Sequence, residues 1–245
     1  MIYDECNRKC KCSNGKTTHC YRIRKEFTSM SLEERKRYIR AFKIVSSKQP
    51  YKKIYDKLTK KHPDYFWKIH VQKFFFPWHR WYILEFENLL RRVDCRVTVP
   101  YWHWSRAVPG NHVFRSTHIR DVWYPGEHGL GGNGTLPKSY VSDGPFACGL
   151  WYESFWLEYP CLKRAFADIP ELSSDKYVQA LFNYPREQFL CFEYAVRMLL
   201  HNSLHNAVGG TMSVDESASA PEFWFHHGFL DKLWSDWQKR GHRSV

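Results

Sequence analysis

The sequence predicts a mainly α-helical fold with long loops and little β-structure. Three observations lead to this prediction. Apolar residues recur at helical spacing in several stretches, and serine or proline stands where some of these stretches begin. Segments rich in glycine and proline separate the stretches, the longest of them running from residue 108 to 145. The composition, 43% apolar and 18% aromatic over 245 residues, suits one substantial core.

The first expected helix begins at Ser31, because residues 31–34, SLEE, have the form of a capping box. In this motif the serine oxygen and the glutamate three residues later each satisfy an unpaired amide of the first turn. An apolar stripe then continues toward Pro50. The stripe consists of Tyr38, Ile39, Phe42 and Val45. We interpret this helix as scaffold.

A second helix is expected from Tyr51, with His62 in phase with its apolar residues and Pro63 as its end. His62 therefore points toward the core. Taken singly, a core histidine with a satisfied ring is the simpler interpretation. His70 follows eight residues later in an aromatic stretch and has no structural assignment of its own.

A third helix is expected to open near Phe74, with Pro77 at an early position that tolerates proline. Its inner face is broad and includes His79, which therefore also projects inward. Apart from His79, this face consists of Tyr82, Ile83, Phe86, Leu89, Leu90 and Val93.

Two histidines four residues apart, His201 and His205, lie in a stretch expected to be helical from about Pro185 to Gly209. Residues at this spacing share one helix face and can hold a metal ion, although two packed or solvated histidines are the commoner case. Glu193, eight residues before His201, returns to within about a quarter turn of it. We interpret Glu193 as a candidate to orient a ligand or a water molecule.

The last expected helix has Pro221 in its first turn and carries the pair His226 and His227. Both histidines are in phase with apolar residues of this helix. Periodicity therefore gives only a slight preference for His227 as the one that faces the core.

The formal charge of +12 favours acidic partners or surfaces. The basic residues are spread along most of the chain and do not gather beside a binding motif, so we expect no nucleic-acid role. No apolar run is long enough to cross a bilayer, and the first residues lack the basic start and apolar middle of a signal peptide. If the protein is exported, that peptide is missing from this sequence. The oligomeric state is not predicted.

Eight cysteines, four of them within the first twenty residues, suggest disulfides and an oxidising compartment, so we expect a secreted protein. We expect a cysteine-rich segment over residues 1–20 and a globular unit over residues 21–245. A zinc knot built from the early thiolates and His19 is the alternative, although the spacing fits no standard knuckle. The pairing of the cysteines stays open. Residues 133–135, NGT, form a glycosylation sequon, which matters only in a secreted chain.

The histidines together supply two groups of three imidazoles. The first group is His62, His70 and His79, and the second is His201 and His205 with one of the pair at 226–227. Imidazole suits copper, and no carboxylate stands among the proposed ligands. Calcium and magnesium would require oxygen ligands. Two zinc ions are compatible with the ligand type, although a catalytic zinc pair usually includes a bridging carboxylate.

Two motifs are specific enough to indicate a family. Residues 76–82, FPWHRWY, with His70 before them and Glu87 after them, resemble the first copper site of tyrosinases, catechol oxidases and molluscan haemocyanins. Residues 200–206, LHNSLHN, and residues 221–227, PEFWFHH, followed by DKLW, resemble the second copper site of that family. Both motifs occur in the family's order, and the resemblance covers about residues 21–240.

The resemblance implies a four-helix bundle that holds two copper ions, with dioxygen bound between them as peroxide. The copper ligands that it implies are His62, His70, His79, His201, His205 and His227. Glu193 and Asn202 match a pair that holds a water molecule able to deprotonate a phenol, and Phe223 and Asn206 match positions that contact the substrate. Asp231 matches an acid that we expect to hydrogen-bond a ligand ring.

Glu193 and Asn202 favour a tyrosinase, which hydroxylates monophenols and oxidises o-diphenols to o-quinones. The substrates would be small phenols or the tyrosyl side chains of proteins. The alternatives are a catechol oxidase that acts on diphenols only, a haemocyanin-like oxygen carrier, and a catalytically silent matrix protein.

The sequence departs from the family pattern at three positions. His103 and Ala220 stand where the family usually has aspartate. Lys68 stands where some members have a cysteine that is cross-linked to a ligand histidine, so we expect no thioether at His70. Something other than an aspartate must fix the turn before Pro221.

Overall fold

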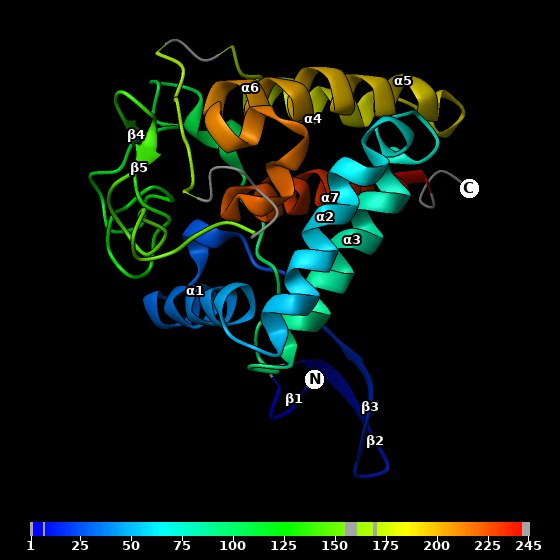
Figure 1. The fold of residues 1–245 in the computed structure, drawn as a ribbon. Helices are drawn as coiled ribbons and strands as arrows, with labels where there is room; N and C mark the ends of the chain where they lie inside the picture. The colour runs from blue at the N-terminus through cyan, green and yellow to red at the C-terminus, as the bar shows by residue number, and fades with distance from the viewer. Residues whose placement is uncertain (1, 7, 155–160, 169–170, 242–245) are drawn as a thin grey trace.

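The computed structural model describes residues 2–6, 8–154, 161–168 and 171–241, and it confirms the mainly α-helical fold (Figure 1). The α-helices are α1 (Leu32–Ser47), α2 (Tyr51–Ile69), α3 (Phe75–Arg91), α4 (Asp175–Ala180), α5 (Phe189–Ala195), α6 (Asn202–Val208) and α7 (Pro221–Gly241). A π-helical segment, Val196–His201, joins α5 to α6. Short 3-10 turns span Phe27–Ser29, Trp104–Ala107, Leu181–Asn183, Arg186–Gln188, Gly210–Ser213 and Asp215–Ser219.

Apart from isolated bridges, the β-structure in the described part of the chain consists of two small antiparallel sheets. The first contains β1 (Ile2–Tyr3), β2 (Lys9–Ser13) and β3 (Lys16–Tyr21), in that order, with Ile2 opposite Cys10. The β2–β3 hairpin extends away from the helices (Figure 1). The second pairs β4 (Gly134–Thr135) with β5 (Tyr140–Val141) inside the long loop that the glycine and proline content predicts.

Six of the eight cysteines form disulfides, which confirms the predicted use of these residues. The pairs are Cys6–Cys95, Cys10–Cys20 and Cys148–Cys161, while Cys12 and Cys191 are free and exposed. Because three of the four early cysteines are paired, their thiolates are not available for the zinc knot considered above. The first bridge connects the N-terminal sheet to the segment that follows α3.

Helix α1 begins as predicted and anchors the core. The Ser31 hydroxyl accepts a hydrogen bond from the Glu34 amide, and the Glu34 carboxylate accepts one from the Ser31 amide. The apolar stripe is buried, and the Phe42 ring packs edge-on against the rings of Phe86 and Phe146. This scaffold supports α2 and α3 from one side.

Helix α2 does not end at Pro63, so that prediction is wrong. It continues through the proline to Ile69. Proline lacks the amide that would bond the carbonyl of Thr59, four residues earlier. The Tyr82 hydroxyl, which donates to the Leu58 carbonyl at 3.0 Å, also lies 3.4 Å from that Thr59 carbonyl. A side chain of α3 therefore supplies the donor that the proline cannot.

The helices that carry the histidines form a four-helix bundle. Helix α2 packs against α1 and α3, α3 packs against α7, and α7 packs against the π segment of the α5–α6 run. Their contact surface is largely aromatic, as where Phe76 of α3 stacks on Trp234 of α7 at 5.1 Å between ring centroids. Within the described residues, no helix combines the length and apolar character needed to span a bilayer.

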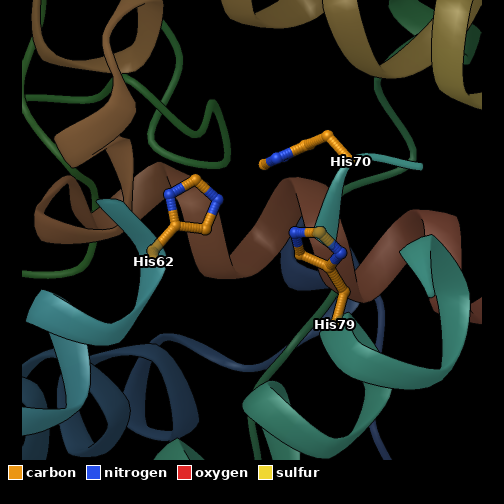
Figure 2. A group of neighbouring side chains, drawn as sticks. All are labelled: His62, His70 and His79. Atoms are coloured by element: carbon orange, nitrogen blue, oxygen red, sulfur yellow. The ribbon is translucent and has the colours of Figure 1, made fainter. Parts of the chain in front are cut away.

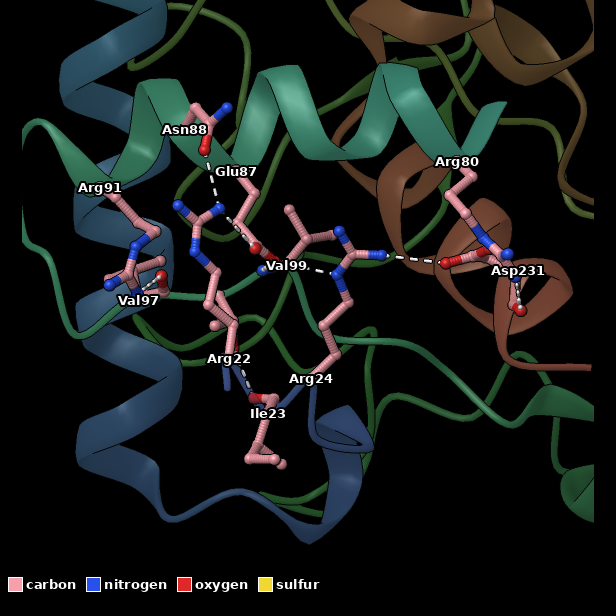
Figure 3. A network of polar contacts seen from close by, with 11 residues as sticks. Arg22, Ile23, Arg24, Arg80, Glu87, Asn88, Arg91, Val97, Val99 and Asp231 are labelled. Carbon is pink, nitrogen blue, oxygen red and sulfur yellow. Dashed lines mark hydrogen bonds and ion pairs between the residues drawn. The ribbon is translucent and has the colours of Figure 1, made fainter. Parts of the chain in front are cut away.

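A charged network ties α3 to α7 through the N-terminal segment (Figure 3). Arg24 donates to Glu87 of α3 at 2.9 Å and to Asp231 of α7 at 3.0 Å. Arg80, which follows His79, also donates to Asp231. Glu87 is buried, and it additionally accepts the backbone amide of Val99. Two helices that carry histidines are thus held together by paired charges.

A buried glutamate makes the stability of the fold depend on pH. Burial raises the pKa of Glu153 to about 8, although a hydrogen bond from Thr211 opposes the shift. Between its ordinary pKa and about 8, the folded chain holds a proton that the unfolded chain has released, so stability falls as pH rises through this window. We expect Glu153→Gln to raise Tm relative to the parent at pH 9 and to change it little at pH 4.

Thermal unfolding followed by circular dichroism at both pH values measures this difference. The exposed Glu187→Gln is the matched control and should show no such pH-dependent gain. An equal effect of Glu153→Gln at the two pH values would show that the carboxyl of Glu153 does not titrate in this window.

Candidate metal centre

The first group of histidines converges from two helices. His62 projects from α2, His70 is the residue that caps the C-terminal end of α2, and His79 projects from the second turn of α3. One ring nitrogen from each of the three lies within 4.8 Å of the others. Figure 2 shows the rings approaching a common point from different directions. Continuation of α2 past Pro63 places His70 here, because it carries the chain to a turn beside α3.

The second group comes from the π segment, α6 and α7. His201 ends the π segment, His205 lies one turn later in α6, and His227 lies in α7. Their ring nitrogens also lie within 4.8 Å of one another, and the Nε2 atoms of His205 and His227 are 3.4 Å apart. His226 is buried beside this group, yet His227 completes it.

The two groups face each other across the bundle. The rings of His79 and His227 stack at 4.3 Å between centroids, with planes only 9° apart. The rings of His70 and His201 are 5.3 Å apart. The six rings therefore form one buried centre with two halves.

Backbone carbonyls fix the orientation of most of these rings. Four of them place Nδ1 against a carbonyl oxygen, which requires the proton on Nδ1 and leaves the Nε2 lone pair free for a metal. These contacts are His62 to Asp215 at 2.6 Å, His70 to Phe66 at 2.9 Å, His79 to Phe75 at 2.7 Å and His205 to Met212 at 2.5 Å. The ring of His201 instead donates from Nδ1 to the side-chain oxygen of Asn202 at 2.8 Å. Such contacts set both the tautomer and the direction of a ligand.

Burial keeps the six imidazoles neutral. It is the largest cause that lowers the pKa of each ring, and for His205 the pKa falls to about 4. Neighbouring imidazoles lower the pKa of several of these rings further, among them His79 and His227. A neutral imidazole is the form that binds a metal ion, so the centre is ready to accept one at neutral pH.

The donor atoms meet the requirements of a pair of copper ions. Within the described part of the chain, the Nε2 atoms of His62, His70, His79 and His201 are buried without a hydrogen-bond partner. Buried nitrogen atoms are normally paired, so orphans that converge on common points indicate that another species satisfies them. Three imidazoles for each ion match the preference of copper for nitrogen ligands.

A cleft of about 180 Å³ opens onto the centre. Its wall includes His62, Phe66, His70, His201, Asn202, His205, Asn206, Met212, Ser213, Val214, Asp215 and Ser217. A cavity of roughly 150 Å³ is enough to hold a benzene molecule. The cleft can therefore admit one aromatic ring of a substrate.

The residues predicted to contact substrate occupy different places. Asn202 and Asn206 both line the cleft. Phe223 is fully buried between the two groups, with its ring 4.1 Å from that of His227 and 5.0 Å from that of His62. Its observed role is to pack the ligand rings, and stacking against a substrate stays a prediction.

Two carboxylates have partners that the sequence analysis did not foresee. Glu193 is fully buried and accepts a hydrogen bond from Arg197 at 2.6 Å. Asp231 bonds Arg24 and Arg80 through its two carboxylate oxygens. The expectation that Asp231 hydrogen-bonds a ligand ring is therefore wrong, because its oxygen atoms are engaged in the network between α3 and α7.

The departures from the family pattern also have structural answers. His103 lies outside both groups, where its Nε2 is 2.8 Å from Asp175 and its ring packs on Phe229. Ala220 needs no side-chain cap, because its amide donates to the Ser217 carbonyl and its carbonyl accepts the Phe223 amide. Backbone hydrogen bonds thus fix the turn before Pro221.

Some functional groups were missed because they are backbone atoms. The carbonyls of Phe66 and Phe75 lie four residues before His70 and His79, a spacing that places them within reach of the ring on a helix. That signal was present in the sequence. The carbonyls of Met212 and Asp215 come from 3-10 turns, for which the sequence offered no comparable sign.

A helical bundle with two facing groups of three histidines defines the class of dinuclear metal proteins with imidazole ligands. Comparison with known proteins identifies the family within this class.

The family model for the common central domain of tyrosinase matches residues 52–240. The tyrosinase of Streptomyces lincolnensis is 32% identical over 245 residues, covering 91% of this chain and 84% of that protein. The tyrosinase of Streptomyces antibioticus is 32% identical over 241 residues, with 89% and 83% covered. The chain belongs to the tyrosinase family of type-3 copper proteins.

Solved structures show the same fold. A polyphenol oxidase from Thermothelomyces thermophila superposes with a TM-score of 0.71 at 23% identity, covering 88% of this chain and 70% of that one. A functional unit of octopus hemocyanin gives a TM-score of 0.58 at 22% identity, covering 90% and 54%. The helical core is therefore shared with a polyphenol oxidase and with a hemocyanin unit.

Proposed function

We propose that this chain is a tyrosinase-type oxidase that hydroxylates monophenols and oxidises o-diphenols to o-quinones with dioxygen. The observation that carries this proposal is the pair of facing histidine groups beside a cleft that can admit one aromatic ring. In the overall reaction a monophenol and one dioxygen give an o-quinone and one water. Two o-diphenols and one dioxygen give two o-quinones and two waters.

The residues of the chain would divide this work. The six imidazoles would hold two copper ions, which supply the binding and activation of dioxygen. The carbonyl acceptors would keep the rings of His62, His70, His79 and His205 directed at the ions. Asn202 and Asn206 supply polar groups at the wall of the cleft. Glu193 would accept the phenolic proton through a water molecule.

Small phenols and exposed tyrosyl side chains of proteins are the substrates that we propose. The cleft opens at the surface, which suits a ring carried either by a free molecule or by a flexible chain. We also propose that the protein acts outside the cell, because its disulfides are typical of oxidising compartments.

Oxygen uptake by the copper-loaded protein tests the proposed function. We expect consumption of dioxygen with both tyrosine and dihydroxyphenylalanine, and an accumulating coloured quinone. Activity on dihydroxyphenylalanine alone would identify a catechol oxidase. Reversible oxygenation without turnover would identify a carrier, and copper binding without either would identify a silent protein.

Asn202→Ala is expected to lower the activity on tyrosine, corrected for the lag phase, by about 10-fold to 100-fold. The change removes an acceptor from the ring of His201 and a polar group from the cleft wall. The exposed Asn183→Ala is the matched control. Unchanged activity on tyrosine in Asn202→Ala, with full copper content, would remove Asn202 from the mechanism.

A further inference from the structure

An ion pair lies beside the metal centre and involves the carboxylate that would act as the base. Arg197 donates from Nε to Oε1 of Glu193 at 2.6 Å. Glu193 is fully buried, and the side chain of Arg197 is only 15% exposed. The other carboxylate oxygen, Oε2, is buried without a hydrogen-bond partner in the described part of the chain. One oxygen of Glu193 is therefore paired with a cation, and the other lacks a donor.

Short contacts connect this pair to the cleft. Arg197 lies in the π segment, and its Nη1 is 3.3 Å from the sulfur of Met198. The side-chain amide of Asn202 is 3.6 Å from the same sulfur, and its oxygen bonds the ring of His201. The positive charge of Arg197 also reaches His70, whose pKa it lowers in addition to the larger effect of burial. The sulfur of Met198 thus lies between the guanidinium and Asn202 of the cleft wall.

The spacing of the two residues is the local reason for this ion pair. Glu193 lies in α5 and Arg197 lies four residues later in the π segment, and side chains at this spacing share one face of a helix. Glu193 therefore meets a cation within its own helical run.

Monophenols and o-diphenols need a base to different extents. The hydroxyl of a monophenol such as tyrosine has a pKa of about 10, so the loss of its proton at neutral pH depends on a positioned base. In an o-diphenol the neighbouring hydroxyl stabilises the developing phenolate by a hydrogen bond. A carboxylate paired with a guanidinium is a weaker base than an unpaired carboxylate, because the cation favours the charged form.

We propose that Arg197 determines substrate preference by holding Glu193 in an ion pair that slows the hydroxylation of monophenols relative to the oxidation of o-diphenols. This inference rests on the proposed function. In the step concerned, the phenolic O–H bond breaks and its proton passes through a water molecule to Oε2 of Glu193. The remaining atoms and electrons follow the overall equations given above.

Arg197→Met tests the inference, because it removes the charge and retains much of the side-chain volume. We expect the ratio of kcat/KM for tyrosine to that for dihydroxyphenylalanine to rise by about tenfold or more, with the diphenol value nearly unchanged. Arg197→Lys should keep the parental ratio. The exposed Arg186→Met, from the turn before α5, is the matched control. The double variant Arg197→Met with Glu193→Gln should lose the gain.

The pH dependence of activity on tyrosine distinguishes this role of Arg197 from a purely structural one, which would leave the pH dependence unchanged. Within the described residues, burial raises the pKa of Glu193 and Arg197 is the charged group that lowers it. In Arg197→Met the acid limb of the tyrosine profile should therefore move to higher pH. At pH values below this limb, infrared difference spectra should show a protonated carboxyl that disappears when Glu193 is also replaced by glutamine. Both variants should retain two copper ions per chain by mass spectrometry.

An unchanged substrate ratio in Arg197→Met, with copper content and diphenol activity intact, would overturn the inference and leave the proposed function standing. Absence of activity on both phenols in the parent protein would instead count against the proposed function itself. If Arg197→Met does not fold, Arg197→Gln carries the same expectation, because it keeps a donor for Glu193 without the charge.

Discussion

Replacement of His79 by alanine is expected to lower phenol-oxidising activity by more than about 100-fold, since even loss of a group that only orients a metal ligand lowers activity by 10-fold to 100-fold. His79 is buried, directed by the Phe75 carbonyl, and stacked on His227 of the other group. Its removal leaves the first copper ion two imidazoles. The copper content should therefore fall from two ions per chain to one.

The measurement combines oxygen uptake with metal analysis of the purified variant. His112→Ala is the matched control, because His112 is exposed and lies outside both groups. Circular dichroism should show the helical content of the parent in both variants. If His79→Ala kept two copper ions and its activity, His79 would not be a ligand, and the assignment of the first group would have to change.

Replacement of Arg164 by methionine is expected to destabilise the fold by about 3–5 kcal/mol, the range found when one partner of a buried ion pair is removed. Arg164 is fully buried and donates to both carboxylate oxygens of Glu222, at 2.8 and 3.0 Å. It also donates to the carbonyls of Leu130, Gly131 and Gly132. The variant leaves a buried carboxylate in the first turn of α7 without its cation.

Urea unfolding followed by fluorescence measures this loss. Arg115→Met is the matched control, because the pair between Arg115 and Asp121 is partly exposed and should contribute less than about 1 kcal/mol. The double variant Arg164→Met with Glu222→Met should recover much of the stability, since no unpaired charge is then buried. A loss in Arg164→Met no larger than in the control would show that the ion pair is not what holds the loop to α7.

The elements that follow local rules could be predicted from the sequence. The capping box at Ser31 and the proline in the first turn of α7 specify helix starts through neighbouring residues alone. The end of α2 could not be predicted in this way. Pro63 breaks a helix in isolation, and only the folded structure brings the Tyr82 hydroxyl to the carbonyls that the proline affects.

The candidate site shows the same division. Helical phase directs His62 and His79 inward, and the motifs distinguish His227 from His226, as the structure then groups them. The partners of the ligands depend on the tertiary fold instead. Asp231 meets Arg24 from a distant segment, which local spacing cannot show, whereas the pair of Glu193 and Arg197 has the four-residue spacing of a helix and could have been predicted. Disulfide pairing likewise joins residues far apart in the chain, as in Cys6–Cys95.

Native mass spectrometry of the chain after loading with copper and removal of excess metal tests the central claim most directly. The six converging rings require a mass increase of two copper ions per chain, bound together and lost together when a chelator is added. A single tightly bound ion, or none, in a correctly folded chain would contradict a dinuclear centre built from these two groups of histidines.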